Sequence, residues 1–157
     1  MTELLDGTCT SLPICVVDDD RQHLAVMSLM LRRMGFYNVR IFSDAREAWS
    51  HICANGSSLI ISDWNMDPMT GIELLTLVRS SATTHNIPFV MVTANCDADY
   101  WKRAIKAGVT EFLFKPLSYR EFEGAVSLAH STGVSGDMNR HCHFQQPAIV
   151  IPLSEAP

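Results

Sequence analysis

Short runs of consecutive apolar residues alternate along this chain with longer stretches in which apolar residues recur every three or four positions. Uninterrupted runs are typical of strands buried on both faces of a sheet, and the wider spacing is typical of amphipathic helices. The first run, Ile14–Val17, precedes a stretch in which Leu24, Met27, Leu31 and Met34 share one helical face. Four further strands are expected at Val39–Phe42, Leu59–Ser62, Phe89–Thr93 and Phe112–Phe114.

The stretches between these runs carry residues suited to the ends of helices. Gly35 is suited to ending the first helix, because glycine readily adopts the left-handed conformation that follows many helices. Either Ser43 or Asp44 can cap the second helix, and Ser118 with Glu121 has the pattern of a capping box for the fifth. The second, third and fourth helices are expected to carry their apolar faces within Ala45–Cys53, Gly71–Ser80 and Asp97–Ala107.

The alternation of five strands with five helices predicts an α/β fold, in which helices cover both faces of a parallel sheet. This doubly wound domain is expected to span 13–130, after a lead at 1–12. The tail at 131–157 lacks a sustained period, although a short strand is expected at Ala148–Ile151. A tail of this length has no room for a DNA-binding domain, so a stand-alone domain is expected.

Composition narrows the class of protein. Apolar residues make up 47% of the chain and charged residues 18%, which is typical of a globular protein. The net charge of −5 and the lack of a basic cluster argue against binding to nucleic acid. No apolar run approaches the ~20 residues that span a bilayer, and Met1–Thr10 does not resemble a signal peptide. Cys15 and Cys53 are interpreted as small buried residues of a cytoplasmic protein.

Polar residues stand at the carboxyl ends of four of the five expected strands. Asp18 and Asp19 follow the first strand, Asp63 follows the third, Thr93 ends the fourth, and Lys115 follows the fifth. Because these strand ends meet at one edge of a parallel sheet, the five side chains are expected to converge. Clustered carboxylates repel one another unless a cation neutralises them, and such oxygen-rich sites suit Mg²⁺. An aspartate there can act as a nucleophile and form an aspartyl phosphate.

Five segments of the chain match a known family when they are taken together. They are Val16–Asp19, Ile60–Met66, Met91–Ala94, Ala107–Gly108 and Phe114–Pro116. Over about 13–130, the chain resembles the CheY-like response-regulator receiver domains. The resemblance implies a flavodoxin-like sheet of five parallel strands in the order 2-1-3-4-5.

The resemblance also implies a role for each residue of the acidic cluster. Asp63 is expected to accept the phosphoryl group. Asp18, Asp19 and Asp63 are expected to hold Mg²⁺, together with the main-chain carbonyl of Asn65. Asp20 is instead expected to cap the first helix.

The remaining expected site residues act on the phosphoryl group or report its presence. The family pattern implies that Thr93 donates a hydrogen bond to the phosphoryl group and that Lys115 pairs with one of its oxygens. Pro116 is expected to follow a cis peptide bond. Phe112 is expected to switch its packing together with Thr93, and Asn65 and Asn95 occupy positions that tune the lifetime of the phosphoryl group.

The expected partners follow from the same resemblance. A histidine kinase or a histidine phosphotransfer protein would donate the phosphoryl group, and a downstream protein would bind the face built from the fourth helix, fifth strand and fifth helix. Neither nucleic acid nor a membrane is expected as a partner, and the protein is expected to be a monomer or weak dimer. It would be a signalling protein that catalyses only its own phosphorylation and slow dephosphorylation.

Three alternatives to a working receiver stay open, and so does the conformation of one loop that departs from the family pattern. A Mg²⁺-dependent phosphatase with an aspartate nucleophile needs a second aspartate where this chain has Asn65. A flavodoxin-like cofactor binder needs a phosphate-binding loop where Asp18–Asp20 would repel phosphate. A receiver fold that has lost its chemistry is the third alternative. In the loop after the acceptor, Pro68 stands one place later than is usual and Asp67 adds an acid, which leaves the loop conformation open.

Overall fold

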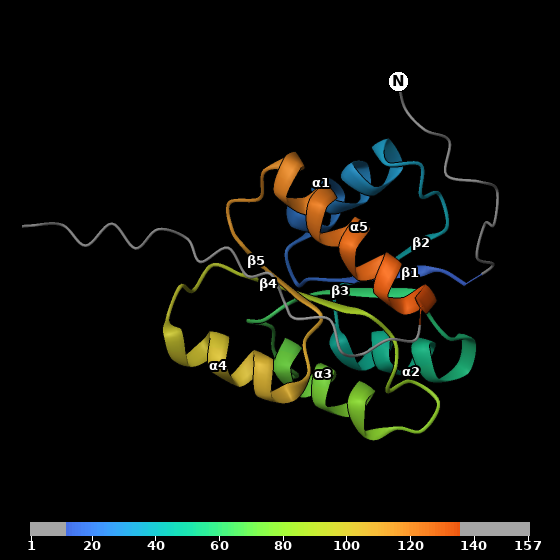
Figure 1. Cartoon of the computed structure of the whole chain (residues 1–157), viewed down its shortest axis with the longest axis vertical. Helices are drawn as coiled ribbons and strands as arrows, with labels where there is room; N and C mark the ends of the chain where they lie inside the picture. The colour runs from blue at the N-terminus through green and yellow to red at the C-terminus, as the bar shows by residue number, and fades with distance from the viewer. Residues whose placement is uncertain (1–11, 136–157) are drawn as a thin grey trace, which may run out of the picture.

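A computed structural model of the protein describes residues 12–135, which form five strands and five helices in strict alternation (Figure 1). The strands are β1 (Ile14–Val17), β2 (Val39–Phe42), β3 (Leu59–Asp63), β4 (Phe89–Thr93) and β5 (Glu111–Phe114). The helices are α1 (Arg21–Arg33), α2 (Ala45–Asn55), α3 (Gly71–Ser80), α4 (Ala98–Ala107) and α5 (Tyr119–Ser135). Within the described residues, no helix is long and apolar enough to cross a membrane.

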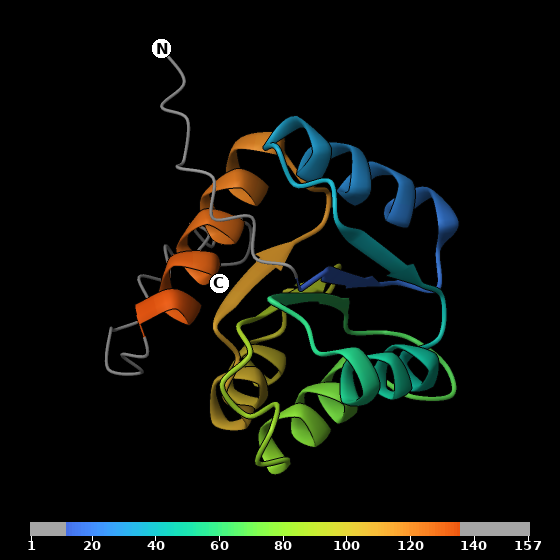
Figure 2. The same cartoon turned by 90° about the vertical axis from the view of Figure 1, so that its right-hand side faces the viewer.

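The strands form one parallel sheet in the order β2-β1-β3-β4-β5, which confirms the predicted fold class. Helices α1 and α5 cover one face of this sheet, and α2, α3 and α4 cover the other (Figures 1 and 2). Chain order reverses at β1 and β3, so the carboxyl ends of these central strands open onto the edge where sites of this architecture lie.

Strand β1 illustrates why the strands read as unbroken apolar runs. Ile14 and Val16 pack with α1 and α5, whereas Cys15 and Val17 pack on the opposite face with α2 and α3. All four side chains are buried. Because successive side chains point to opposite faces, a strand covered on both sides needs an apolar residue at every position.

The helix termini follow local sequence closely. The side chain of Asp20 caps α1 by accepting a hydrogen bond from the Gln22 N–H (2.8 Å), as predicted. Of the two candidates for α2, Asp44 forms the cap. Gly35 follows the end of α1 with φ of 93°, a left-handed conformation that suits glycine. The Ser118 hydroxyl accepts a hydrogen bond from the Glu121 N–H (3.2 Å) at the start of α5.

One prediction about the helices, the burial of Cys53, was wrong. Cys53 is exposed, because the buried face of α2 is centred on Ala45, Ala48 and Ile52, and Cys53 lies about 100° around the helix from Ile52. Helix α5 continues to Ser135 although its apolar period ends near Ala129, since helix continuation requires backbone hydrogen bonds but no buried face. The strand expected at Ala148–Ile151 lies outside the described residues.

Glu111, the first residue of β5, makes the stability of the fold depend on pH. It is only 9% exposed, and burial raises its pKa from 4.5 to about 7. Between these two pH values the folded protein holds a proton that the unfolded chain has lost, so the free energy of unfolding falls as pH rises. We expect Glu111→Gln to raise the free energy of unfolding by about 2 kcal/mol above pH 7 and to have little effect near pH 4.

Urea titrations of the wild type and of Glu111→Gln, near pH 4 and above pH 7, measure the difference in the free energy of unfolding. Glu47→Gln is the matched control, because Glu47 is an exposed glutamate in the first turn of α2. If Glu111→Gln stabilised the fold equally at both pH values, the raised pKa of Glu111 would be contradicted.

Candidate functional site

The candidate site lies where β1, β3, β4 and β5 end. Asp18 follows β1 directly, Asp63 and Thr93 are the last residues of β3 and β4, and Lys115 follows β5. The parallel register places Asp63 opposite Val92, one residue before Thr93, so the strand ends are nearly level. The structure therefore brings together at one edge the polar residues that the strand pattern predicted.

Three carboxylates form the acidic part of the site. Asp18, Asp19 and Asp63 each offer an oxygen within 4.8 Å of the other two. Asp18 is fully buried and Asp63 is 5% exposed, whereas Asp19 is exposed to solvent. Three carboxylates at this spacing repel one another unless cations neutralise them. Their hard oxygen donors and the open side at Asp19 fit Mg²⁺, which retains several waters when it binds.

Lys115 supplies one positive charge to this cluster. Its Nζ lies 3.0 Å from Oδ2 of Asp18 and 3.3 Å from Oδ1 of Asp63, and its side chain is only 13% exposed. The other oxygen of Asp18 accepts a hydrogen bond from the Asp20 N–H (2.9 Å). The Lys115–Pro116 peptide bond is cis, as the family resemblance implied. One ammonium among three carboxylates leaves a net negative site that favours a divalent cation.

The environment of Asp63 disfavours its charged form. Burial, and then the neighbouring charge of Asp18, raises the pKa of Asp63, while Lys115 opposes this shift. A cation bound by the same carboxylates would, like Lys115, lower the pKa of Asp63 and so favour its ionised, nucleophilic form.

Thr93 connects the site to the start of α4. Its side chain is fully buried, and its hydroxyl accepts a hydrogen bond from the Asn95 N–H (3.1 Å). The side chain of Asn95 in turn accepts a hydrogen bond from the N–H of Asp97, the cap of α4 (2.9 Å). A movement of the Thr93 hydroxyl would therefore disturb the turn that leads into α4.

Trp64 links Asp63 to α4 and β5 through aromatic contacts. It follows Asp63 directly, is 3% exposed, and stacks at a tilt against Tyr100 of α4 with ring centroids 4.6 Å apart. The guanidinium of Arg103 lies 5.4 Å from the Trp64 ring. Phe112 is packed inward, with its ring centroid 6.4 Å from that of Trp64. The sequence pattern placed Phe112 near the site but did not reveal the contacts from α4.

The loop between β3 and α3 contains the departure from the family pattern. The Asp67–Pro68 peptide bond is cis, and Asp67 is exposed and is not one of the three clustered carboxylates. Asn65, two residues after Asp63, is also exposed. The N–H of Gly71 donates to the Trp64 carbonyl (2.8 Å), which closes the loop against β3.

Sequence reasoning missed His23 as a neighbour of the site. Its ring is 44% exposed, as expected for a surface residue, yet its Nδ1 lies 2.8 Å from Nζ of Lys115 and 3.3 Å from Oδ2 of Asp18. The usable signal was its position in the first turn of α1, three residues after the Asp20 cap, because that turn starts at the acidic strand end.

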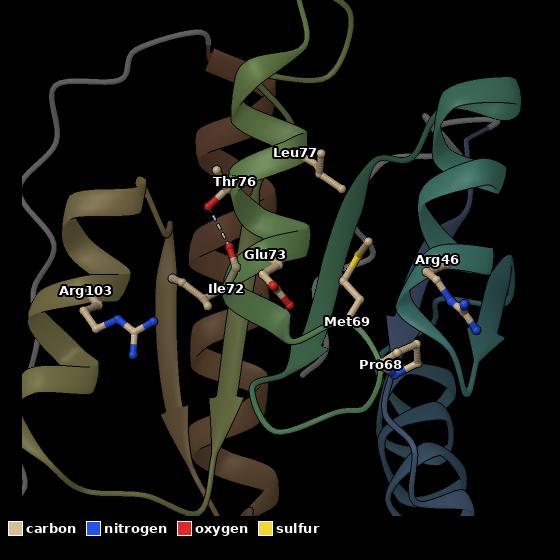
Figure 3. A pocket seen from close by; sticks show the side chains of 8 residues that line it. All are labelled: Arg46, Pro68, Met69, Ile72, Glu73, Thr76, Leu77 and Arg103. Carbon is tan, nitrogen blue, oxygen red and sulfur yellow. Dashed lines mark hydrogen bonds between the residues drawn. The ribbon is translucent and has the colours of Figure 1, made fainter.

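A hollow of about 610 Å³ lies beside α3, away from the acidic cluster. Figure 3 shows it running along Ile72 and Thr76, with Arg103 of α4 on one side and Arg46 of α2 on the other. Neither Asp63 nor Lys115 lines this hollow.

The family model described as response regulator receiver domain matches residues 14–127. This chain belongs to that family. The receiver is 33% identical to chemotaxis protein CheY of Pseudomonas aeruginosa over 105 residues, which is 67% of this chain and 85% of that protein. It is also 33% identical to chemotaxis protein CheY1 of Helicobacter pylori (strain 26695) over 106 residues, covering 67% of this chain and 86% of the relative.

Solved structures support the same assignment for the receiver. A putative response regulator from Chloroflexus aurantiacus superposes with a TM-score of 0.72 at 28% identity, covering 76% of this chain and 98% of the other. Chemotaxis protein CheY4 of Vibrio cholerae gives a TM-score of 0.69 at 27% identity, with coverage of 74% and 96%. The chain is therefore a CheY-like receiver domain of two-component signal transduction.

Proposed function

We propose that this receiver takes a phosphoryl group from a phosphohistidine donor onto Asp63 and signals by binding another protein. The observation that carries the proposal is the surroundings of Asp63. Its carboxylate is buried at the carboxyl end of β3, 3.3 Å from the Lys115 ammonium and within 4.8 Å of the carboxylates of Asp18 and Asp19. A carboxylate in such a place is a suitable nucleophile toward phosphorus.

In the proposed reaction, an oxygen of Asp63 forms a bond to the phosphorus while the bond from phosphorus to the donor histidine nitrogen breaks. The departing imidazole keeps the bonding electron pair. Lys115 is close enough to Asp63 to donate a hydrogen bond to an oxygen of the transferred group. Mg²⁺, held by Asp18, Asp19, Asp63 and the Asn65 carbonyl, would supply further positive charge to the transferring group.

The phosphoryl group would then change the surface of the domain through Thr93. Its hydroxyl, which now accepts from the Asn95 N–H, would turn to donate to the phosphoryl group. This movement would alter the turn into α4 and the packing space around Phe112. A partner that binds the face of α4, β5 and α5 would sense the change as a shift between two conformations. We place this exchange in the cytoplasm, between a histidine kinase or phosphotransfer protein and a downstream protein.

The site does not favour the alternative of a phosphatase. An acid–base group two residues beyond the nucleophile would have to be Asn65, whose amide does not exchange protons in this way. The Asp18–Asp20 segment after β1 likewise lacks the amide-lined loop that binds the phosphate of a flavin. Turnover of a free phosphomonoester, or a copurified yellow cofactor, would reverse these two conclusions.

The proposal is tested by incubating the protein with acetyl phosphate or phosphoramidate, with and without Mg²⁺. We expect a Mg²⁺-dependent gain of the mass of one phosphoryl group, and peptide mapping should locate it at Asp63. The fluorescence of Trp64 should change at the same time, because its ring is buried next to the acceptor. No mass gain from small donors or from several phosphohistidine proteins would indicate a receiver fold that has lost its chemistry.

A further inference from the structure

We propose that His23 is a positioning residue for Lys115, which holds one N–H of the ammonium so that the other two point at Asp18 and Asp63. This inference rests on the proposed phosphorylation of Asp63. It assigns a role to a side chain of α1 that contacts neither the acceptor nor, in the proposed site, the metal.

The contacts of Lys115 match its hydrogen-bonding capacity. Its Nζ lies 2.8 Å from Nδ1 of His23, 3.0 Å from Oδ2 of Asp18 and 3.3 Å from Oδ1 of Asp63. An ammonium group has three N–H donors and no acceptor. Three acceptors therefore surround three donors, and the shortest of the three contacts is the one to the imidazole.

The donor chemistry of Lys115 determines the tautomer of His23. Because the ammonium only donates, Nδ1 of His23 must accept, which places the ring proton on Nε2. Nδ1 also lies 3.3 Å from Oδ2 of Asp18, and no hydrogen bond joins these two atoms when both are acceptors. The shared ammonium is what holds the imidazole and the carboxylate side by side.

The imidazole is carried by a well-anchored part of the fold. Asp20 caps α1 three residues before His23, and the next residue, Leu24, is buried against the sheet with Met27. A lysine side chain, by contrast, has four rotatable bonds and loses about 2 kcal/mol of rotamer entropy when it is held in place. His23 thus provides a fixed acceptor that selects one arrangement of a flexible donor.

Orientation of the ammonium before transfer should increase the rate, since a donor already in place needs no reorganisation as charge develops. Without the imidazole, one N–H of Lys115 would lose its partner and the ammonium would be free to turn toward water or Asp18. Because the imidazole is 44% exposed, water can partly replace it, so the loss of this hydrogen bond should lower the rate about three- to tenfold.

A matched pair of substitutions isolates the acceptor atom. The amide oxygen of His23→Asn takes nearly the place of Nδ1, whereas His23→Leu puts a methyl group there. With phosphoramidate and Mg²⁺, we expect His23→Leu to gain the phosphoryl mass about three- to tenfold more slowly than the wild type. His23→Asn should stay within about twofold of the wild type, and both variants should keep the wild-type thermal midpoint within a few degrees.

A second measurement needs neither metal nor donor. Long-range ¹H–¹⁵N spectra at mildly alkaline pH should show His23 with its proton on Nε2, and Lys115→Met should weaken this preference. A proton on Nδ1, equal rates for the wild type and His23→Leu, or equal slowing by Leu and Asn would overturn the proposal. A wild type that accepts no phosphoryl group would instead overturn the proposed function, and the spectra would still report whether the contact exists.

Discussion

Asp63→Asn is expected to abolish phosphorylation from every donor, with a rate lowered by at least about a thousandfold. The amide has nearly the shape of the carboxylate but lacks the negatively charged oxygen that attacks phosphorus. The same change should stabilise the fold, because burial and the charge of Asp18 both disfavour the ionised form of Asp63. We expect the free energy of unfolding at neutral pH to rise.

Intact mass after incubation with acetyl phosphate and Mg²⁺, together with urea unfolding, measures both effects. A loss of phosphorylation with a gain in stability excludes unfolding as the cause. Asp67→Asn is the control, since Asp67 is an exposed carboxylate in the loop after Asp63 and lies outside the acidic cluster. Phosphorylation that persists in Asp63→Asn and maps to another residue would show that Asp63 is not the acceptor.

Gly71→Ala is expected to lower the free energy of unfolding by about 3 kcal/mol and to displace the loop that follows Asp63. A methyl group at Gly71 would overlap the carbonyl oxygen of Asp63 and lie 3.0 Å from Sδ of Met91. The strand cannot move aside easily, because β3 pairs with β1 on one side and with β4 on the other. The Gly71 N–H also holds α3 to the Trp64 carbonyl (2.8 Å), so displacement would break this bond.

Gly124→Ala is the matched control for this prediction. Gly124 lies within α5, and a methyl group there would meet nothing within 4 Å. Alanine favours helix by up to about 1 kcal/mol over glycine, so the control should be as stable as the wild type or more stable. A midpoint of urea unfolding for Gly71→Ala equal to that of the wild type would refute the close approach of α3 to Asp63.

The boundaries of the strands and most helices follow from local sequence, for reasons that operate over a few residues. Ile14–Val17 and Phe89–Thr93 have the predicted bounds, because central strands covered on both faces must be apolar throughout. Asp20 and Gly35 mark the ends of α1 through hydrogen bonds and backbone conformation that depend on immediate neighbours. Cys53 was misplaced because a helical period of three or four does not specify where the centre of the buried face lies.

Parallel topology also carries the polar strand ends to one edge, so Asp18, Asp63 and Lys115 were predictable as neighbours once the strands were recognised. The contacts from the helices were not predictable in this way. His23 of α1 and Lys115 are 92 residues apart in sequence, and Tyr100 of α4 contacts Trp64, which follows β3. Such contacts depend on how each helix is rotated and placed against the sheet, and packing of the whole core decides this rather than any local pattern.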